Sequence, residues 1–157
     1  MPSYFQTALV FGNAVQHAID TKLVQLERFN CNRNNGQKLA QVFGWKVLGA
    51  GHFSSVYANP FDTNTVFKVN ISKQGAVPDA WIDYASWCMR HENEDPHYLR
   101  VYEIAVFPDC FVSIMERLEE SSPVQRTIAM HVLDTDDVPI PAELSTQVKK
   151  FREAYLR

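Results

Sequence analysis

The chain has 157 residues, of which 46% are hydrophobic and 21% are charged, and its formal net charge is −3. This composition is typical of a soluble globular protein, and the length predicts a single domain over residues 1–157. The negative charge argues against direct binding of nucleic acid, because nucleic-acid-binding domains carry a basic patch. No apolar run is long enough to span a bilayer, so we expect no membrane partner.

Neither the cysteines nor the histidines have the spacing of a disulfide framework or a metal site. The odd number of cysteines and the lack of a secretory leader predict that the protein resides in a reducing cytoplasm. The histidines are scattered without metal-ligand spacing, so we expect no bound metal ion. These residues are Cys31, Cys88 and Cys110, and His17, His52, His91, His97 and His131.

Residues 1–43 are expected to form a helical N-terminal segment. Apolar residues recur mainly at intervals of three and four, which predicts a long amphipathic helix from Ser3 to Phe29. Ser3 is its candidate N-cap, and the cluster from Asn32 to Gly36 is its candidate stop. Two alternatives remain open: the helix packs on a sheet and completes the core, or it binds a partner or pairs in a homodimer. The apolar positions are Leu9, Val15, Ile19, Leu23 and Leu26.

A meander of three short strands is predicted next. The first runs from Gln41 to Leu48 into a glycine turn, the second covers residues 55–58, and the third covers residues 66–70 after a turn rich in Asn and Asp. Apolar residues at helical spacing then predict an amphipathic helix from Asp79 to Arg90 that packs on the sheet.

Two further strands and two helices follow. Residues 101–106 and 110–118 are predicted to form a hairpin that completes a five-stranded antiparallel sheet, so the fold class is α+β. Helices are predicted over residues 122–132 and 142–156, because a proline lies near the start of each. The domain thus divides into residues 1–43, a sheet over 44–120 and C-terminal helices over 121–157.

The glycine turn and a lysine on the third strand are the candidate binding elements. Gly49 and Gly51 lack a Cβ atom, so their backbone amides are open to close approach by an anion. Lys68 supplies a compact positive charge that suits a phosphate. Two glycines between strands are most often only a hairpin turn, and it is the order of the surrounding elements that favours a site.

From about Gly44 to Glu120 the sequence resembles the N-lobe of a protein kinase, and most closely the early-gene Ser/Thr kinase of short-tailed coliphages. The resemblance implies a vestigial nucleotide site formed by Gly49, Gly51, Ser54, Lys68, Met115 at the gatekeeper place and Glu116 in the hinge. It implies no cofactor beyond weak ATP binding. The matching residues are Leu48, Gly49, Gly51, His52, Phe53, Ser54 and Tyr57, then Lys68, Val69, Tyr84, Ala85, Cys88, Val101 and Tyr102.

Departures from the kinase pattern predict a catalytically inactive protein. Ser54 replaces the third glycine of the loop, and Asp83 is the nearest acid that the helix offers to Lys68. No H-R-D-x-x-x-x-N or D-F-G motif follows residue 120, and the acids at 134, 136 and 137 lack the Asn and Gly of those motifs. Without them there is no base for the substrate hydroxyl and no carboxylate cage for Mg²⁺.

Two function classes remain. The first is a phage protein that binds and inhibits a protein complex in the host bacterial cytoplasm, for example as an anti-CRISPR inhibitor, with Trp81, Trp87, Tyr98 and Tyr102 as expected contacts. The second is the nucleotide-binding N-terminal fragment of a phage Ser/Thr kinase. Basic residues in the last turns of the C-terminal helix are typical of a complete helix and favour the first class.

Overall fold

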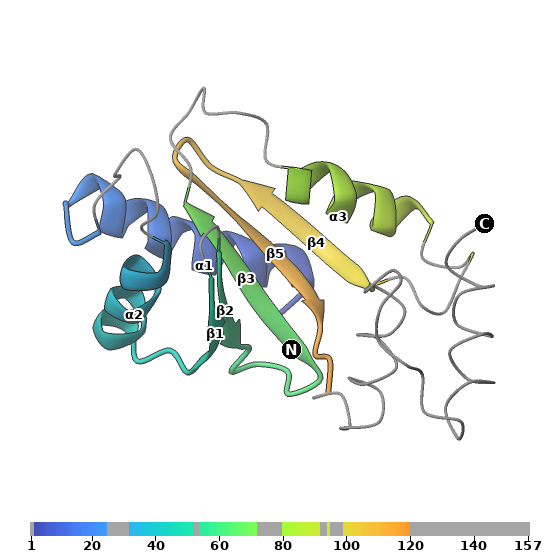
Figure 1. Cartoon of the computed structure of the whole chain (residues 1–157), viewed down its shortest axis with the longest axis horizontal. Helices are drawn as coiled ribbons and strands as arrows, with labels where there is room; N and C mark the ends of the chain where they lie inside the picture. The colour runs from blue at the N-terminus through green and yellow to red at the C-terminus, as the bar shows by residue number, and fades with distance from the viewer. Residues whose placement is uncertain are drawn as a thin grey trace, which may run out of the picture. The chain divides into compact units, whose positions relative to one another are not determined.

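The computed structural model describes residues 2–24, 32–51, 54–71, 80–91, 94 and 99–119 (Figure 1). The chain divides into two compact units, Met1–Arg117 and Leu118–Arg157, and the first unit holds the elements described below. The helices expected over 122–132 and 142–156 lie outside the described residues. The assignment of the whole chain to a single domain stays a prediction. In the described part of the chain, no helix has the length and apolar character that crossing a membrane requires.

The first unit contains one five-stranded sheet in which every neighbouring pair is antiparallel. Its strand order is β1-β2-β3-β5-β4, so β5 lies between β3 and β4. This confirms the predicted α+β fold with a five-stranded antiparallel sheet. The strands are β1 (Val47–Ala50), β2 (Ser55–Ala58), β3 (Thr65–Ile71), β4 (Val101–Val106) and β5 (Cys110–Glu116).

Helices cover both faces of this sheet, and α3 lies along β4 in Figure 1. Side chains alternate between the faces of a strand, so each strand contributes to two cores. One face packs against α1 (Tyr4–Asp20) and α2 (Asn32–Phe43), and the other packs against α3 (Ala80–Arg90).

Aromatic rings dominate the core beneath α1 and α2. Phe11 of α1 stacks on Phe67 of β3 with ring centroids 3.7 Å apart, and Phe67 stacks on Tyr57 of β2 at 4.9 Å. Trp45 meets Phe11 edge to face at 5.4 Å. Edge-to-face pairs such as Trp45–Phe11 stabilise a core beyond the area that they bury. The N-terminal helix therefore packs on the sheet and completes its core, as the first of the two alternatives predicted.

The core beneath α3 is smaller, and its fully buried side chains are not aromatic. Ala85 and Cys88 are buried on the inner face of α3, against Val66, Val101 and Met115 from three strands. The amphipathic helix predicted over residues 79–90 is thus confirmed at its expected place on the sheet.

The predicted extent of the first helix is wrong at its C-terminal end. Ser3 caps the start as expected, because its hydroxyl accepts from the Gln6 amide and Gln6 Oε1 accepts from the Ser3 amide. The helix ends at Asp20 instead of Phe29: Lys22 has a φ of 60° and the Val24 amide donates to the Ala18 carbonyl. Such a left-handed residue closes a helix, and the chain turns before Leu23.

A second helix occupies the segment that was expected to be a stop and a strand. The cluster from Asn32 to Gly36 forms the first turns of α2, and residues 41–43 form its end. Gly44, with a φ of 67°, follows the last helical residue, and the first strand begins at Val47. Burial of Leu39, which is 1% exposed, outweighs the low helix propensity of the asparagines.

Candidate functional site

The strand register places two candidate residues, Gly49 and Lys68, on one row across the sheet. Gly49 lies directly opposite Val56, Val56 lies opposite Lys68, and Lys68 lies opposite Ser113. Residues directly opposite one another in a sheet share a face. Gly49, which follows a bulge in β1, and Lys68 therefore belong to the same face of the sheet, which is the face that carries α3.

The glycine turn is open to solvent. Gly49 and Gly51 are both exposed, and the Gly51 amide donates to the Ser54 carbonyl at 2.8 Å, which closes the hairpin. A Cβ atom added at Gly49 would meet nothing within 4 Å, and one at Gly51 would lie 3.9 Å from the Ser54 carbonyl oxygen. Neither glycine has a left-handed φ. Packing and conformation thus leave the choice of glycine unexplained at both positions. The two residues at the tip of the hairpin, 52 and 53, lie outside the described residues.

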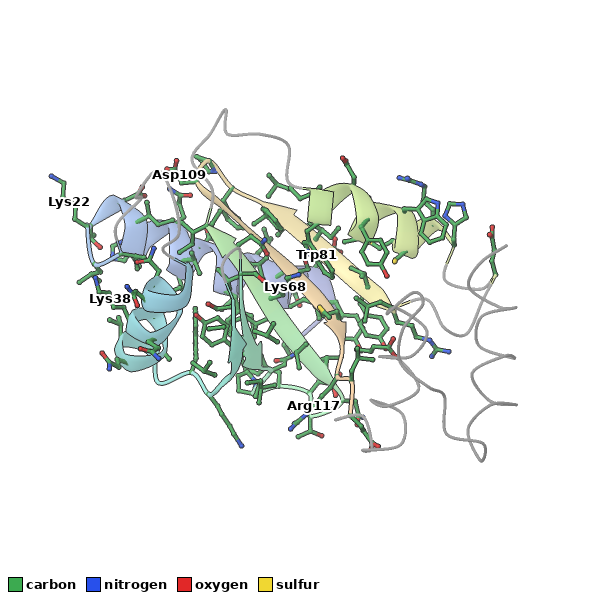
Figure 2. All side chains as sticks on the ribbon, viewed as in Figure 1. Lys22, Lys38, Lys68, Trp81, Asp109 and Arg117 are labelled. Atoms are coloured by element: carbon green, nitrogen blue, oxygen red, sulfur yellow. The ribbon has the colours of Figure 1, made fainter. Side chains whose placement is uncertain are left out.

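Lys68 is half-buried in β3, and its ammonium group lies over an aromatic ring of α3. Lys68 Nζ is 3.1 Å from the centroid of the Trp81 ring, a cation–π contact, and both residues are labelled in Figure 2. The indole Nε1 of Trp81 donates to Ser113 Oγ at 3.1 Å. Ser113 is the residue opposite Lys68, so strand pairing and α3 together fix the ammonium position.

Asp83, the acid expected nearest to Lys68, is exposed in the first turn of α3. It follows Trp81 by two residues, which is roughly 200° around a helix with 3.6 residues per turn. Asp83 therefore lies on the opposite side of α3 from the ring that Lys68 contacts.

The two candidate residues at the end of β5 have structural partners. Met115 is 9% exposed and lies opposite Val66 and Val101 in the core beneath α3. The Glu116 carboxylate accepts from the Arg100 amide at 2.8 Å, and the Glu116 amide donates to the Arg100 carbonyl at 2.9 Å. Glu116 thereby ties the residue before β4 to the end of β5.

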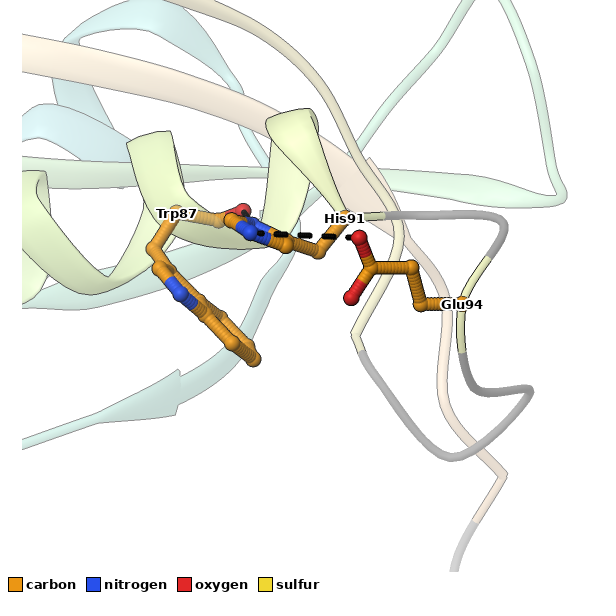
Figure 3. A network of polar contacts seen from close by, with 3 residues as sticks. All are labelled: Trp87, His91 and Glu94. Atoms are coloured by element: carbon orange, nitrogen blue, oxygen red, sulfur yellow. Dashed lines mark hydrogen bonds and ion pairs between the residues drawn. The ribbon is translucent and has the colours of Figure 1, made fainter.

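Of the four aromatic residues expected to bind a partner, the three that the structure describes do not lie on one face of the sheet. Trp87 is half-buried and stacks on His91 at 4.5 Å, and His91 also contacts the Trp87 carbonyl and Glu94 (Figure 3). Tyr102 stacks on Tyr4 of α1 at 4.7 Å, on the other face of the sheet. Trp81 covers Lys68, and residue 98 lies outside the described residues. A role of these side chains in partner binding stays a prediction.

The contact of Trp81 with Lys68 is the site feature that sequence reasoning missed. The available signal was the spacing of Trp81, Ala85 and Cys88, which puts all three on the helix face that meets the sheet. That spacing identifies the inner face of α3, and it says nothing about which strand residue meets Trp81.

Comparison with known proteins identifies one family. A family model described as bacteriophage T7 protein kinase 0.7 matches residues 12–148. The match begins within α1 and extends beyond residues 44–120, so the relationship is not limited to the N-lobe-like region that carries the resemblance in the sequence. No curated protein and no solved structure matches the chain.

Proposed function

Because this chain belongs to the bacteriophage T7 protein kinase family, we propose that its sheet binds the phosphate groups of a nucleoside triphosphate. Lys68 and the backbone amides of the Gly49–Gly51 turn supply the contacts. The same residues do not transfer the phosphoryl group by themselves. The ligand is held weakly, because the residues that bind Mg²⁺ in a kinase belong to the catalytic loop and the D-F-G motif, which this sequence lacks.

The observation that carries this proposal is the cross-strand row that joins Gly49 to Lys68. Adjacent strands are about 4.8 Å apart, so residues two strands apart on one row are separated by roughly 10 Å. In the structure the Lys68 ammonium lies over Trp81, and we propose that its flexible four-carbon stem lets it meet a phosphate held at the turn. A phosphate group fits between the ammonium and the turn amides, which is the arrangement that kinases use.

The glycine turn supports the proposal independently. At Gly49 and Gly51 neither a left-handed φ nor a close neighbour requires glycine. A ligand that approaches the backbone from solvent does require it, because a Cβ atom would stand between the ligand and the amides.

Absence of phosphoryl transfer is proposed from the sequence. No H-R-D-x-x-x-x-N and no D-F-G occurs in the 157 residues. Phosphoryl transfer depends on positioning and electrostatic stabilisation, so loss of both the base and the metal ligands removes the main contributions.

Calorimetric titration of the full chain with ATP and Mg²⁺ tests the binding proposal. Lys68→Met is expected to weaken binding by roughly 10- to 100-fold, because a hydrogen bond to a charged group contributes about 1.5–3 kcal/mol. Lys38→Met is the matched control, since Lys38 is exposed on α2, which covers the other face of the sheet. Equal affinity of the wild type and Lys68→Met would contradict the proposal.

A phosphorylation assay with radiolabelled ATP and a generic protein substrate tests the second half of the proposal. We expect no transfer above background by the purified chain. If the wild type transfers phosphate and Lys68→Met does not, the chain is an active kinase. That result would contradict the proposed lack of transfer, and it would not contradict nucleotide binding.

A second candidate function is inhibition of a protein complex in the host bacterial cytoplasm, for example in anti-CRISPR defence evasion. The observation that favours it is the exposure of two phenylalanines in neighbouring segments. Phe5 is 56% exposed and Phe61 is 45% exposed, and the Tyr4 hydroxyl donates to Asp62 Oδ2 at 3.3 Å, which joins the two segments. Exposed apolar side chains that form a contiguous patch are typical of interaction surfaces.

A pull-down from host lysate separates the two candidates. If the chain is an inhibitor, the Lys68→Met variant still captures the partner complex, and the double variant Phe5→Ser, Phe61→Ser does not. Capture that Lys68→Met abolishes would contradict the inhibitor function, and so would capture that the double variant leaves unchanged.

A further inference from the structure

We propose that Trp81 is a positioning residue for Lys68, and that its indole ring holds the ammonium group where the phosphates of a nucleotide meet it. The role in nucleotide binding rests on the proposed function. The contact itself rests on the geometry of α3 and the sheet alone.

The indole ring of Trp81 is fixed from several sides. Its Nε1 donates to Ser113 Oγ at 3.1 Å, and Ser113 is fully buried in β5. One and two turns further along α3, Ala85 and Cys88 are also fully buried against the sheet. On the same helix, the Tyr84 ring lies 5.6 Å from the Trp81 ring. The face of the indole is therefore held toward the row that carries Lys68.

The ring restrains the ammonium without adding a formal negative charge. An aromatic face attracts a cation through its quadrupole, and the indole of Trp is the strongest of the aromatic side chains in this respect. The ammonium is a compact charge with three donors on a flexible stem, and a ring face restrains it without neutralising that charge. A carboxylate in the same place would compete with phosphate for the charge.

This geometry predicts the direction of the effect. Loss of the ring removes one restraint on the Lys68 stem, so binding of a phosphate must then order it further, and affinity falls. For Trp81→Leu we expect about three- to tenfold weaker binding of ATP, the range that a partly exposed cation–π contact gives. Trp81→Phe keeps a weaker aromatic face, so its affinity for ATP is expected to lie between the affinities of the wild type and Trp81→Leu.

The contact can be tested in solution without a nucleotide. In the full chain labelled with ¹³C-lysine, the ε-methylene protons of Lys68, assigned with Lys68→Arg, are expected upfield of those of the other lysines because they lie over a ring. Trp81→Leu should abolish this shift, and Trp87→Leu should leave it unchanged, since Trp87 stacks on His91 instead. A Lys68 signal at the ordinary position in the wild type would overturn the proposal.

A double-mutant cycle tests the role in binding. ATP affinity is measured for the wild type, Trp81→Leu, Lys68→Met and the double variant, with Trp87→Leu as the control. If Trp81 acts through Lys68, Trp81→Leu has no further effect in the Lys68→Met background. Equal weakening in both backgrounds, or tighter binding by Trp81→Leu, would overturn the positioning role and leave the proposed function intact.

The two proposals fail in different ways. If the wild type binds no ATP, the proposed function is wrong, and the positioning role in binding fails with it, although the upfield shift would still establish the contact. If the wild type binds ATP and Lys68→Met weakens binding, while Trp81→Leu and Trp81→Phe match the wild type, only the positioning role is wrong. Trp81→Phe keeps this test decisive if Trp81→Leu does not fold.

Discussion

At the scale of single residues, Tyr57 joins the sheet to α2. Its side chain is fully buried, and its hydroxyl donates to the Gly36 carbonyl at 2.9 Å. Burial raises the pKa of the Tyr57 phenol to about 12, because the charged phenolate is poorly solvated in the core. The sequence shows an aromatic residue on a short strand, and the partner of its hydroxyl group comes from a helix that sequence analysis did not predict.

The raised pKa of Tyr57 predicts a loss of stability at high pH. The unfolded phenol ionises near pH 10, whereas the folded phenol keeps its proton up to about pH 12. Between these two values the unfolded chain binds fewer protons than the folded chain, so the free energy of unfolding falls as pH rises. Below pH 10 the contribution of Tyr57 to stability is fully present.

Urea unfolding of the wild type and Tyr57→Phe at several pH values checks this prediction. Near pH 8 the variant should lose about 1 kcal/mol, the usual value of one hydrogen bond. The difference should shrink between about pH 10 and 12, because only the wild type carries the titrating phenol. A difference that stays constant over this range would contradict the raised pKa.

At the scale of elements, α2 is the one that depends most on its neighbours. Three of its first four residues, Asn32, Asn34 and Asn35, are asparagines, which are poor helix formers. Burial of Leu39 and the contact of Gly36 with β2 hold the helix against the sheet. Helix stability in proteins comes mainly from such packing.

Gly36→Ala is expected to destabilise the protein although alanine favours a helix. A Cβ atom at this position would lie 2.0 Å from Ser55 Oγ and 2.8 Å from Ser55 Cβ, and Ser55 is 2% exposed. Overpacking of this kind costs about 1–3 kcal/mol, which exceeds the gain in helix propensity of about 1 kcal/mol over most of that range.

Thermal or urea unfolding measures this effect, with Gly49→Ala as the matched control. A Cβ atom at Gly49 meets no neighbour within 4 Å, so its stability should stay within about 0.5 kcal/mol of the wild type. A Gly36→Ala variant at least as stable as the wild type would show that α2 can move away from β2.

At the scale of the whole molecule, the unit Met1–Arg117 holds the sheet, its two cores and the candidate site. The last residue of this unit is tied to the sheet, because the Arg117 amide donates to the Asn64 carbonyl at 2.8 Å. A unit with its own core is expected to fold independently.

Truncation after residue 119 tests this expectation. The fragment should show a single cooperative unfolding transition by circular dichroism, at both far- and near-ultraviolet wavelengths, as small domains with one core do. It should also keep the upfield Lys68 signal. A non-cooperative transition, or loss of near-ultraviolet signal, would show that residues 120–157 are needed to fold the sheet.

Sequence reasoning identified the strands from β2 to β5 and the helix α3, because their signals are local. Alternating apolar residues and turn residues predict strands over residues 55–58 and 101–106, and helical spacing predicts the helix over residues 79–90. Local signals also predicted the capping residue Ser3. They failed at α2, where polar residues suited to a turn are held in a helix by contacts with β2.

For the candidate site, too, some features follow from local sequence and others depend on contacts between distant residues. Residue order alone predicts a glycine turn before a strand with Lys68 and establishes that the kinase catalytic motifs are missing. The folded chain adds that Gly49, Lys68 and Ser113 share one row and that Trp81 covers the lysine. Strand register and the placement of a helix on a sheet depend on contacts between distant residues, and no local pattern encodes such contacts.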